Sequence, residues 1–320
     1  MQTITVDGCS ICQLKCVKCP VSQMGYKNTI GKGYLSYDNF SKLISENPNV
    51  KHIEFDNFGE LFCNPHLSAI MKDAYNYNIM LSCAGGVNLN NVTELTLENL
   101  VRYRFRYLTV SIDGASEETY GKYRVGGNYA DVIDHLITIN KYKQMFKSPY
   151  PKLQWQFIVF GHNEHEIRKA RQTAQDFGMR FYPKMNWDPA YSPINNVEQV
   201  KADTGWEVTT REEYEKKYGT SYVRPTCYQL WNTPRLSWDL SVTGCCWNTW
   251  ERFNQDTVKQ ARQMLTGKIR ARPDVPCDEC EIYRGIEQTN TYLTKQELTE
   301  NYLKQQVGTE LNYYRWWLNI

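Results

Sequence analysis

The sequence predicts an α/β fold, a partial (β/α)6 TIM-like barrel with a small C-terminal α+β extension. Three observations support this fold class. Apolar or alternating segments, which favour strands, take turns with longer amphipathic segments, which favour helices. Strands joined through helices build a parallel sheet with right-handed connections. The polar motifs also follow the carboxyl ends of the predicted strands, where barrel enzymes place their sites.

The predicted barrel covers residues 1–182. Its strands are expected at 2–7, 50–56, 78–83, 107–112, 153–159 and 179–183. Its helices are expected at 36–47, 65–76, 92–101, 129–146 and 164–177. The segment "LTVSID" at 108–113 illustrates the basis of these assignments, because its apolar and polar residues alternate as in a strand with one buried face.

Residues 183–226 are predicted to bridge the barrel and the extension, because Pro, Asn and Asp are frequent there and no periodicity is visible. Within them, "TREEYEKKYG" is expected to form a short helix with a capping box from Thr210 to Glu213. Long irregular loops in compact proteins are often functional. Asp188 and Tyr191 are therefore either substrate contacts or members of a solvated loop.

The composition is that of a globular chain without a strong overall charge. With 41% hydrophobic residues, the 320-residue chain can bury a large core. The 37 basic and 35 acidic residues leave a net charge of +2, so no overall field recruits nucleic acid or a membrane. The chain has no signal peptide and no apolar run of the length that a membrane span needs. We therefore expect a cytoplasmic chain whose cysteines stay reduced and bind metal or take part in chemistry.

Four of the eleven cysteines lie in the N-terminal segment "CSICQLKCVKC". Zinc sites usually separate two CxxC pairs by about a dozen residues or more, whereas only three residues separate Cys12 from Cys16. Cys12, Cys16 and Cys19 form the pattern CxxxCxxC, a tight loop that can ligate three irons of an iron–sulfur cube and leave the fourth open. Cys9 lies outside this pattern and is either a bystander thiol or an alternative ligand.

This CxxxCxxC motif after a short N-terminal strand resembles that of the radical S-adenosylmethionine superfamily. The resemblance implies that Cys12, Cys16 and Cys19 hold a 4Fe-4S cluster whose open iron binds S-adenosylmethionine (AdoMet). It also implies an external electron donor of the flavodoxin or ferredoxin type. Reductive cleavage of AdoMet would then give a 5′-deoxyadenosyl radical that removes hydrogen from unactivated carbon, while the protein aims the reactants and excludes water.

The segment "NFGE" at 57–60, after the second predicted strand, is similar to the GGEP segment of this superfamily. The similarity implies that Gly59 and Glu60 receive the ammonium group of AdoMet. Phe58 and Leu61 depart from the motif, because Phe58 stands for its first Gly and Leu61 for its Pro. The expected donor geometry therefore depends chiefly on the carboxylate of Glu60.

The segment "SIDGASEETY" resembles the fourth-strand region of superfamily members that carry SPASM-type extensions. The resemblance implies that Ser111 and Asp113 approach the ribose of AdoMet. Arg124 is the candidate for the AdoMet carboxylate, because a guanidinium binds a carboxylate bidentately, or else it forms an ordinary ion pair. Asn163, at the exit of the fifth predicted strand, is expected near the adenine or the ribose.

Residues 227–285 form the predicted extension, and residues 286–320 a helical tail that either docks on the barrel or offers a partner surface. The cysteine pattern of the extension, with a predicted hairpin and a final CxxC, resembles a SPASM or twitch domain. The resemblance implies a second, fully ligated 4Fe-4S cluster, with a structural zinc site as the alternative. The implied ligands are Cys227, Cys245 (or its neighbour Cys246), Cys277 and Cys280.

Two spare thiols, Cys63 and Cys83, follow predicted strands and are either hydrogen donors to a radical or packed core residues. The resemblance implies maturation of a ribosomally made peptide by epimerisation, cross-linking or backbone excision, which the richness in Tyr and Trp favours. The alternatives are dehydrogenation or epimerisation of a sugar, an aminoglycoside or another small molecule, and, more distantly, a non-catalytic metal-binding module. Because the chain starts at its first strand, recognition of a peptide is expected to need either a separate leader-peptide-binding protein or the C-terminal region.

Overall fold

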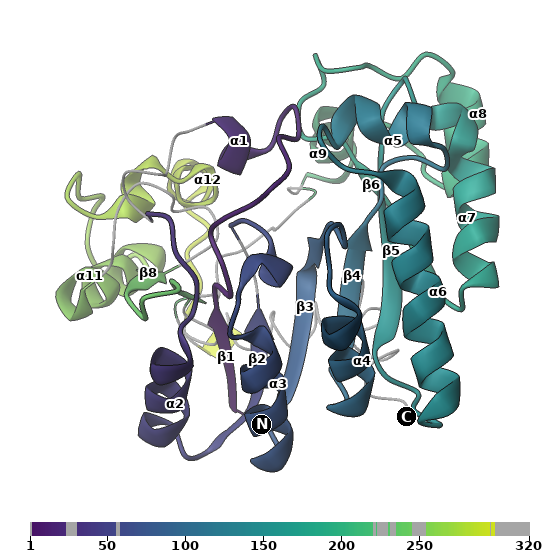
Figure 1. The fold of residues 1–320 in the computed structure, drawn as a ribbon. Coiled ribbons are helices and arrows are strands. Elements are labelled where there is room, and N and C mark those ends of the chain that lie inside the picture. Colours follow the sequence, from purple (N-terminus) through teal and green to yellow (C-terminus); the bar gives the residue numbers. More distant parts are fainter. Residues whose placement is uncertain are drawn as a thin grey trace.

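The computed structural model describes residues 2–23, 31–55, 58–219, 222, 230, 235–244, 254–294 and 296–297. Within these ranges, eight strands form one sheet in the order β6-β5-β4-β3-β2-β1-β7-β8 (Figure 1). The strands are β1 Gln2–Val6, β2 Val50–Phe55, β3 Met80–Val87, β4 Tyr107–Ser111, β5 Lys152–Val159, β6 Arg180–Met185, β7 Arg235–Leu236 and β8 Val242–Gly244. Every neighbouring pair from β1 to β6 is parallel. The partial barrel expected from the sequence is thus confirmed.

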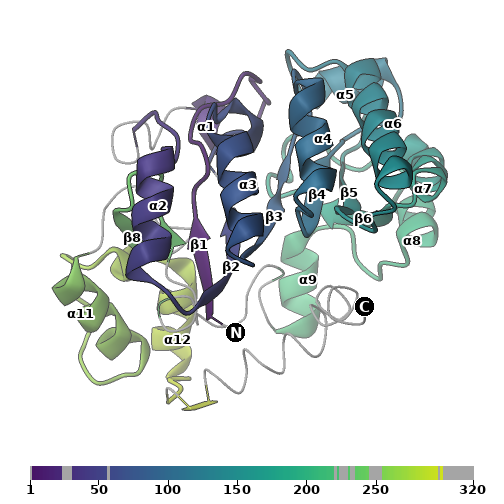
Figure 2. The same cartoon turned by 60° about the horizontal axis from the view of Figure 1, so that its bottom comes forward.

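Helices cover one face of this sheet. Figure 2 shows α2, α3, α4, α6 and α7 in an arc outside the strands. The helices are α1 Pro20–Gln23, α2 Tyr37–Glu46, α3 Leu67–Asn76, α4 Glu94–Arg102, α5 Glu117–Tyr123, α6 Tyr129–Met145, α7 Ile167–Asp176, α8 Val197–Thr204, α9 Arg211–Tyr218, α11 Gln255–Leu265 and α12 Glu281–Thr289, with the 3-10 turns η1 Leu61–Cys63, η2 Glu164–Glu166 and η3 Pro276–Glu279. In the part of the chain that the structure describes, no helix is long and apolar enough to cross a membrane.

The two faces of the sheet differ in polarity. Residues at alternate positions, such as Leu108 and Val110 of β4, belong to the main hydrophobic core beneath the helices. The residues between them are buried and polar, and form what we call the inner face. The inner face includes His52, Ser82, Thr109, Ser111, Gln154 and Gln156. A buried polar face of this kind provides groups that can position a ligand at the carboxyl end of the barrel.

The third strand is longer than the sequence suggests. It was expected to end at residue 83, because Gly85 and Gly86 indicate a turn on composition alone. In the structure it spans Met80–Val87. Gly86 has φ +108°, and a Cβ at this position would lie 2.3 Å from Ser111 Oγ. The neighbouring strand therefore requires glycine here, so the two glycines mark a close approach within the sheet.

Four of the described helices, α1, α5, α8 and α11, were not expected, whereas the short helix predicted between the barrel and the extension is present. The sequence analysis has no helix at α5 or at α8, although Ser116 and Asn196 cap their N-termini. The predicted short helix is α9, and both hydrogen bonds of the capping box between Thr210 and Glu213 are present. The segment expected to be a plain bridging loop is thus partly helical.

The extension is attached to the barrel through the sheet itself. The predicted hairpin is confirmed as β7 and β8, and β7 pairs in parallel with β1. Helices α11 and α12 lie beyond β1, at the opposite edge from β6 (Figure 1). They enclose a second hydrophobic core of Leu230, Ala261, Met264, Leu265, Val275, Cys277, Tyr283 and Ile286. The proposed ligands Cys227, Cys245 and Cys246 and the predicted tail from 298 onward lie outside the described residues.

Candidate functional site

The three motif cysteines lie on the loop that leaves the carboxyl end of β1. Cys16 is buried, and Cys12 and Cys19 are half-buried. All three contact one apolar cluster, whose other members include Tyr123 of α5 and Phe160 after β5. The loop is held in place because the amide of Cys19 donates to the carbonyl of Cys16 at 3.2 Å. The motif therefore places its three thiols against one apolar cluster after the carboxyl end of β1.

This set of donors fits an iron–sulfur cluster with one open iron. Burial raises the pKa of the Cys12 thiol to about 12 and also raises the pKa of Cys16. Thiolates at this place therefore need a compensating positive charge, which bound iron supplies. Within the described ranges, no three His, Cys, Asp or Glu side chains are grouped as ligands of a single metal ion. Ligands of a cube bind separate irons, so they need not meet at one point.

Gly59 allows a close approach between its own backbone and the cysteine loop. Its φ is +121°, and a Cβ would lie 2.6 Å from the carbonyl oxygen of Cys9. The next amide, that of Glu60, donates to the carbonyl of Ile11 at 2.8 Å. The predicted Gly59–Glu60 turn thus lies directly against the cysteine motif. Asn57, the first residue of that predicted segment, lies outside the described residues.

Glu60 lies at the site, but its carboxylate already accepts hydrogen bonds from backbone amides. It is 1% exposed, and its carboxylate accepts hydrogen bonds from the amides of Asn88 at 2.7 Å and Phe62 at 3.2 Å. Burial raises the pKa of Glu60 to about 7, although these amides and the charge of Arg124 act in the opposite direction. Its binding of the AdoMet ammonium stays a prediction.

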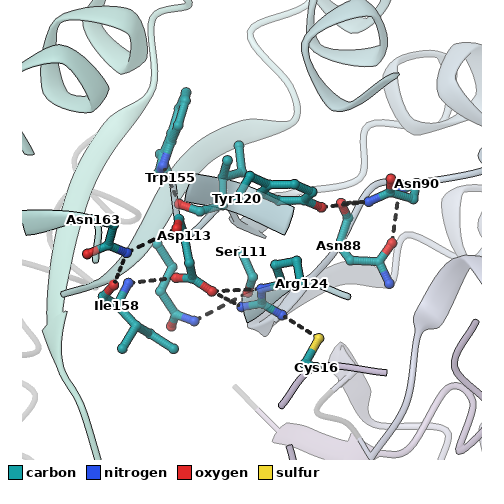
Figure 3. A network of polar contacts seen from close by, with 12 residues as sticks. Cys16, Asn88, Asn90, Ser111, Asp113, Tyr120, Arg124, Trp155, Ile158 and Asn163 are labelled. Carbon is teal, nitrogen blue, oxygen red and sulfur yellow. Dashed lines mark hydrogen bonds and ion pairs between the residues drawn. The ribbon is translucent and has the colours of Figure 1, made fainter. Parts of the chain in front are cut away.

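Arg124, the C-cap residue of α5, joins β4 to the cysteine loop (Figure 3). Its Nε and Nη2 contact Asp113 Oδ2 at 2.7 and 2.6 Å, and its Nη1 lies 3.8 Å from Cys16 Sγ. Asp113 is fully buried, and its other oxygen accepts the amide of Ile158 at 2.7 Å. The sequence assigned Arg124 and Asp113 to different parts of AdoMet, whereas the structure pairs them with each other.

Ser111 and Asn163 both lie close to Asp113, since Ser111 precedes it by two residues and Asn163 contacts its carbonyl (Figure 3). Ser111 Oγ accepts the side-chain amide of Gln156 at 3.3 Å. Asn163 is fully buried, and its amide donates to the carbonyls of Asp113 at 3.0 Å and Ile158 at 2.9 Å. Asn163 therefore fixes the exit of β5, and the contacts of both side chains with the nucleoside stay predictions.

Two amide side chains that follow the end of β3, those of Asn88 and Asn90, were not among the expected site residues. Asn88 Nδ2 lies 3.8 Å from Cys12 Sγ, and Asn88 Oδ1 accepts the side chain of Gln13 at 3.0 Å. Asn90 donates to the hydroxyl of Tyr120 at 2.8 Å (Figure 3). The asparagine-rich segment "NLNN" at 88–91 could have indicated them. It did not, because the predicted strand ended at residue 83 and so this segment was not placed directly after a strand.

The spare thiols occupy different places. Cys63, at the end of η1, donates to Gln13 Oε1 at 3.3 Å, close to the side chain of Cys12. Cys83 does not follow its strand as expected, because it lies within β3, fully buried in the main core. It therefore faces the helices rather than the inner face. Cys9 is also fully buried, and its sulfur accepts the amide of Ile11 at 3.4 Å.

The loop after β6 packs on the cysteine loop. Asp188 forms a 2.8 Å ion pair with Lys18, which lies between two motif cysteines. The ring of Tyr191 contacts those of Tyr123 and Phe160, with centroid distances of 5.9 and 5.4 Å. Tyr191 thus packs against the cluster that includes the three thiols, and Asp188 joins this loop to the cysteine loop, while other residues of the loop, such as Trp187, are exposed.

In the extension, Cys277 and Cys280 lie at η3, where the amide of Cys280 donates to the carbonyl of Cys277 at 3.1 Å. Cys277 is buried in the second core and Cys280 is half-buried beside it. The CxxC pair is therefore folded as a compact turn. The other ligands expected for this pair, Cys227 and Cys245 or Cys246, lie outside the described residues.

No family model and no curated protein matches this sequence. Solved structures do match. SuiB of Streptococcus suis bound to S-adenosylmethionine aligns with a TM-score of 0.57 and 10% identity, over 89% of this chain and 67% of SuiB. Native anSMEcpe with bound AdoMet aligns with a TM-score of 0.55 and 15% identity, over 98% of this chain and 99% of that protein. This chain shares their fold. SuiB bound to the precursor peptide SuiA also matches, with a TM-score of 0.53 and 11% identity, over 89% of this chain and 66% of SuiB.

Proposed function

We propose that this chain is a radical AdoMet enzyme. The observation that carries the proposal is the placement of Cys12, Cys16 and Cys19 in one half-enclosed apolar cluster at the mouth of the barrel. The turn at Gly59 lies directly against their loop. The fold is that of two proteins solved with AdoMet, which supports this assignment.

In this proposal, Cys12, Cys16 and Cys19 hold a 4Fe-4S cluster and its open iron receives AdoMet. When bound and reduced by an external flavodoxin- or ferredoxin-type donor, such a cluster would supply the electron for cleavage of AdoMet to methionine and a 5′-deoxyadenosyl radical. Tyr123 and Tyr191 exclude water from the sulfur side of the site. Water exclusion protects such a reactive species from side reactions.

The remaining polar residues would orient AdoMet. We assign Gly59 and Glu60 to its ammonium group, and Ser111, Asp113 and Asn163 to the nucleoside side. Arg124 is held by Asp113 through two of its nitrogens, which leaves Nη1 directed to Cys16 and the space beside it. A guanidinium fixed in this way can attract a carboxylate without losing further side-chain freedom.

We assign the substrate to the class of ribosomally made peptides. The observation that favours it is the match to SuiB in complex with its precursor peptide SuiA. A separate leader-peptide-binding protein belongs to this proposal as a partner. Cys277 and Cys280, together with Cys227 and Cys245, would hold the second cluster, and Cys63 is the candidate hydrogen donor near Cys12.

The test is anaerobic reconstitution of three proteins, followed by iron analysis and assay of 5′-deoxyadenosine formed from AdoMet. We expect two 4Fe-4S clusters in the wild type, and only one, with no 5′-deoxyadenosine, in the variant with Cys12, Cys16 and Cys19 changed to Ala. Cys83→Ala is the matched control, because it removes a buried thiol outside the site and should retain both clusters. A wild type that holds zinc and no iron would contradict the proposal.

A further inference from the structure

The hairpin of the extension touches the N-terminal motif region through one aromatic side chain. Trp238 lies in the turn between β7 and β8, where the amide of Leu240 donates to the carbonyl of Ser237 at 2.9 Å. β7 is paired with β1, so the turn lies beside the loop that leaves β1. The hairpin thus brings a large ring close to the start of the cysteine loop.

The ring of Trp238 lies against glycine on one side. A Cβ at Gly33 would lie 2.6 Å from three atoms of the indole, so only glycine leaves room for the ring. Gly33 has no positive φ, which means that its backbone does not itself require glycine. The absence of a side chain at Gly33 is therefore explained by the indole alone.

The same ring packs against the turn that precedes Gly59. Trp238 and Val21 of α1 both pack on the buried ring of Phe58. The guanidinium of Arg235, in β7, lies 5.7 Å from the centroid of the same phenyl ring. The hairpin therefore contacts Phe58, the residue before Gly59, and the same phenyl ring contacts Val21, which follows Cys19 by two residues.

A polar contact continues from Gly33 into the cysteine loop. The amide of Gly33 donates to Ser10 Oγ at 2.9 Å, and the amide of Ser10 donates to the carbonyl of Gly33 at 2.9 Å. Ser10 is buried and lies two residues before Cys12. Displacement of Gly33 would thus be passed to the cysteine loop through two hydrogen bonds.

We propose that Trp238 is a positioning residue through which the C-terminal extension sets the placement of the cysteine loop and of the Phe58–Glu60 turn. The role is mechanical, because the contacts that carry it lead from Trp238 to Gly33 and to Phe58. This inference rests on the proposed function only for its consequence, which is the effect on AdoMet binding.

The test is a double-mutant cycle with Gly33→Ala, Trp238→Ala and the combined variant in the full-length reconstituted protein. The first measurement is the rate of hydrogen exchange of the backbone amides at 9–23, which needs no bound AdoMet. The second is the dissociation constant of AdoMet, with the change that AdoMet causes in the electron paramagnetic resonance signal of the reduced protein. Gly121→Ala is the matched control, because a Cβ there meets nothing within 4 Å.

We expect faster exchange at 9–23 and AdoMet binding weakened about tenfold or more in both single variants, because small misplacements in a preorganised site are costly. The combined variant should be no worse than Trp238→Ala, since the added methyl then occupies space that the indole has left. Gly121→Ala should match the wild type. Wild-type exchange at 9–23 in both single variants would overturn the proposal, whether or not the protein binds AdoMet. Absence of AdoMet binding in the wild type, together with faster exchange in the variants, would overturn the proposed function alone.

Discussion

At the scale of the residue, Gly59 joins two motifs that are far apart in the sequence. Its backbone approaches the carbonyl of Cys9 so closely that no side chain fits, and its φ of +121° strains any other residue. The sequence resemblance assigned Gly59 to a cofactor. The structure adds a steric reason for glycine that does not depend on a cofactor at all.

Gly59→Ala should therefore destabilise the protein by about 2–5 kcal/mol, which combines backbone strain with overpacking against backbone atoms. Gly178→Ala is the matched control, because Gly178 also has a positive φ but its Cβ would meet nothing within 4 Å. Gly178→Ala should lower the free energy of unfolding only by the cost of backbone strain, about 1–2 kcal/mol. Urea unfolding under anaerobic conditions measures both changes. Equal losses in the two variants would show that the contact with the cysteine loop is unimportant.

Arg124 and Asp113 form a buried ion pair whose members depend on each other. Arg124 is 14% exposed and Asp113 is fully buried. Arg124→Gln should cost about 3–5 kcal/mol, because it leaves the Asp113 carboxylate buried without a partner. Arg124→Gln combined with Asp113→Asn should recover part of this loss, since neither charge then remains. The free energies of unfolding of the two variants and the wild type decide the matter, and a double variant less stable than Arg124→Gln would refute the pairing.

At the scale of the element, strand ends determine which residues reach the site. The sequence placed most strands within one or two residues, because their alternation is clear, and it correctly put Ser111 and Asp113 at a strand exit. The prediction was wrong at β3, because Gly85 and Gly86 have the composition of a turn. Asn88, which contacts Cys12, was therefore not placed at a strand exit. A close approach between two strands is a tertiary property, which local composition does not carry.

The inner face of β2 and β3 holds a polar network around His52. The ring nitrogens of His52 lie 3.4 Å from Thr3 Oγ1 and 2.5 Å from Ser82 Oγ, and Ser82 in turn donates to Glu54. Glu54 lies 3.8 Å from His52 Nε2. Burial, with a smaller effect from the charge of Arg106, nevertheless lowers the pKa of His52 to about 4. The imidazole is therefore neutral in the folded protein at neutral pH.

This shift predicts a loss of stability in mild acid. The unfolded chain takes up a proton on His52 near pH 6.5, whereas the folded chain does so only near pH 4. The contribution of His52 is therefore complete above pH 6.5 and is lost as the pH falls, by about 2 kcal/mol between pH 7.5 and pH 5. His52→Gln should remove that part of the slope. Urea unfolding of both proteins at several pH values tests this, and parallel slopes would contradict it.

At the scale of the whole molecule, the order of strands and helices was predictable because the barrel repeats one unit, and each unit carries its own local pattern. The attachment of the extension was not predictable. β7 has only the two residues Arg235 and Leu236, and its pairing with β1 joins segments more than two hundred residues apart. Trp238 and Gly33 meet for the same reason. Such contacts follow from packing between distant segments, which a single sequence does not reveal.

The extension should contribute its own cluster without cleaving AdoMet. Cys277→Ala with Cys280→Ala should remove one cluster and abolish conversion of substrate, while some uncoupled 5′-deoxyadenosine formation remains at the first site. The second core encloses Cys277 together with Met264, Leu265 and Tyr283, so much of its apolar contact survives the loss of two sulfurs. Circular dichroism and the iron retained at the first site establish that the variant is folded before activity is compared. A folded variant that still converts substrate at the wild-type rate would limit the role of this cluster to stability.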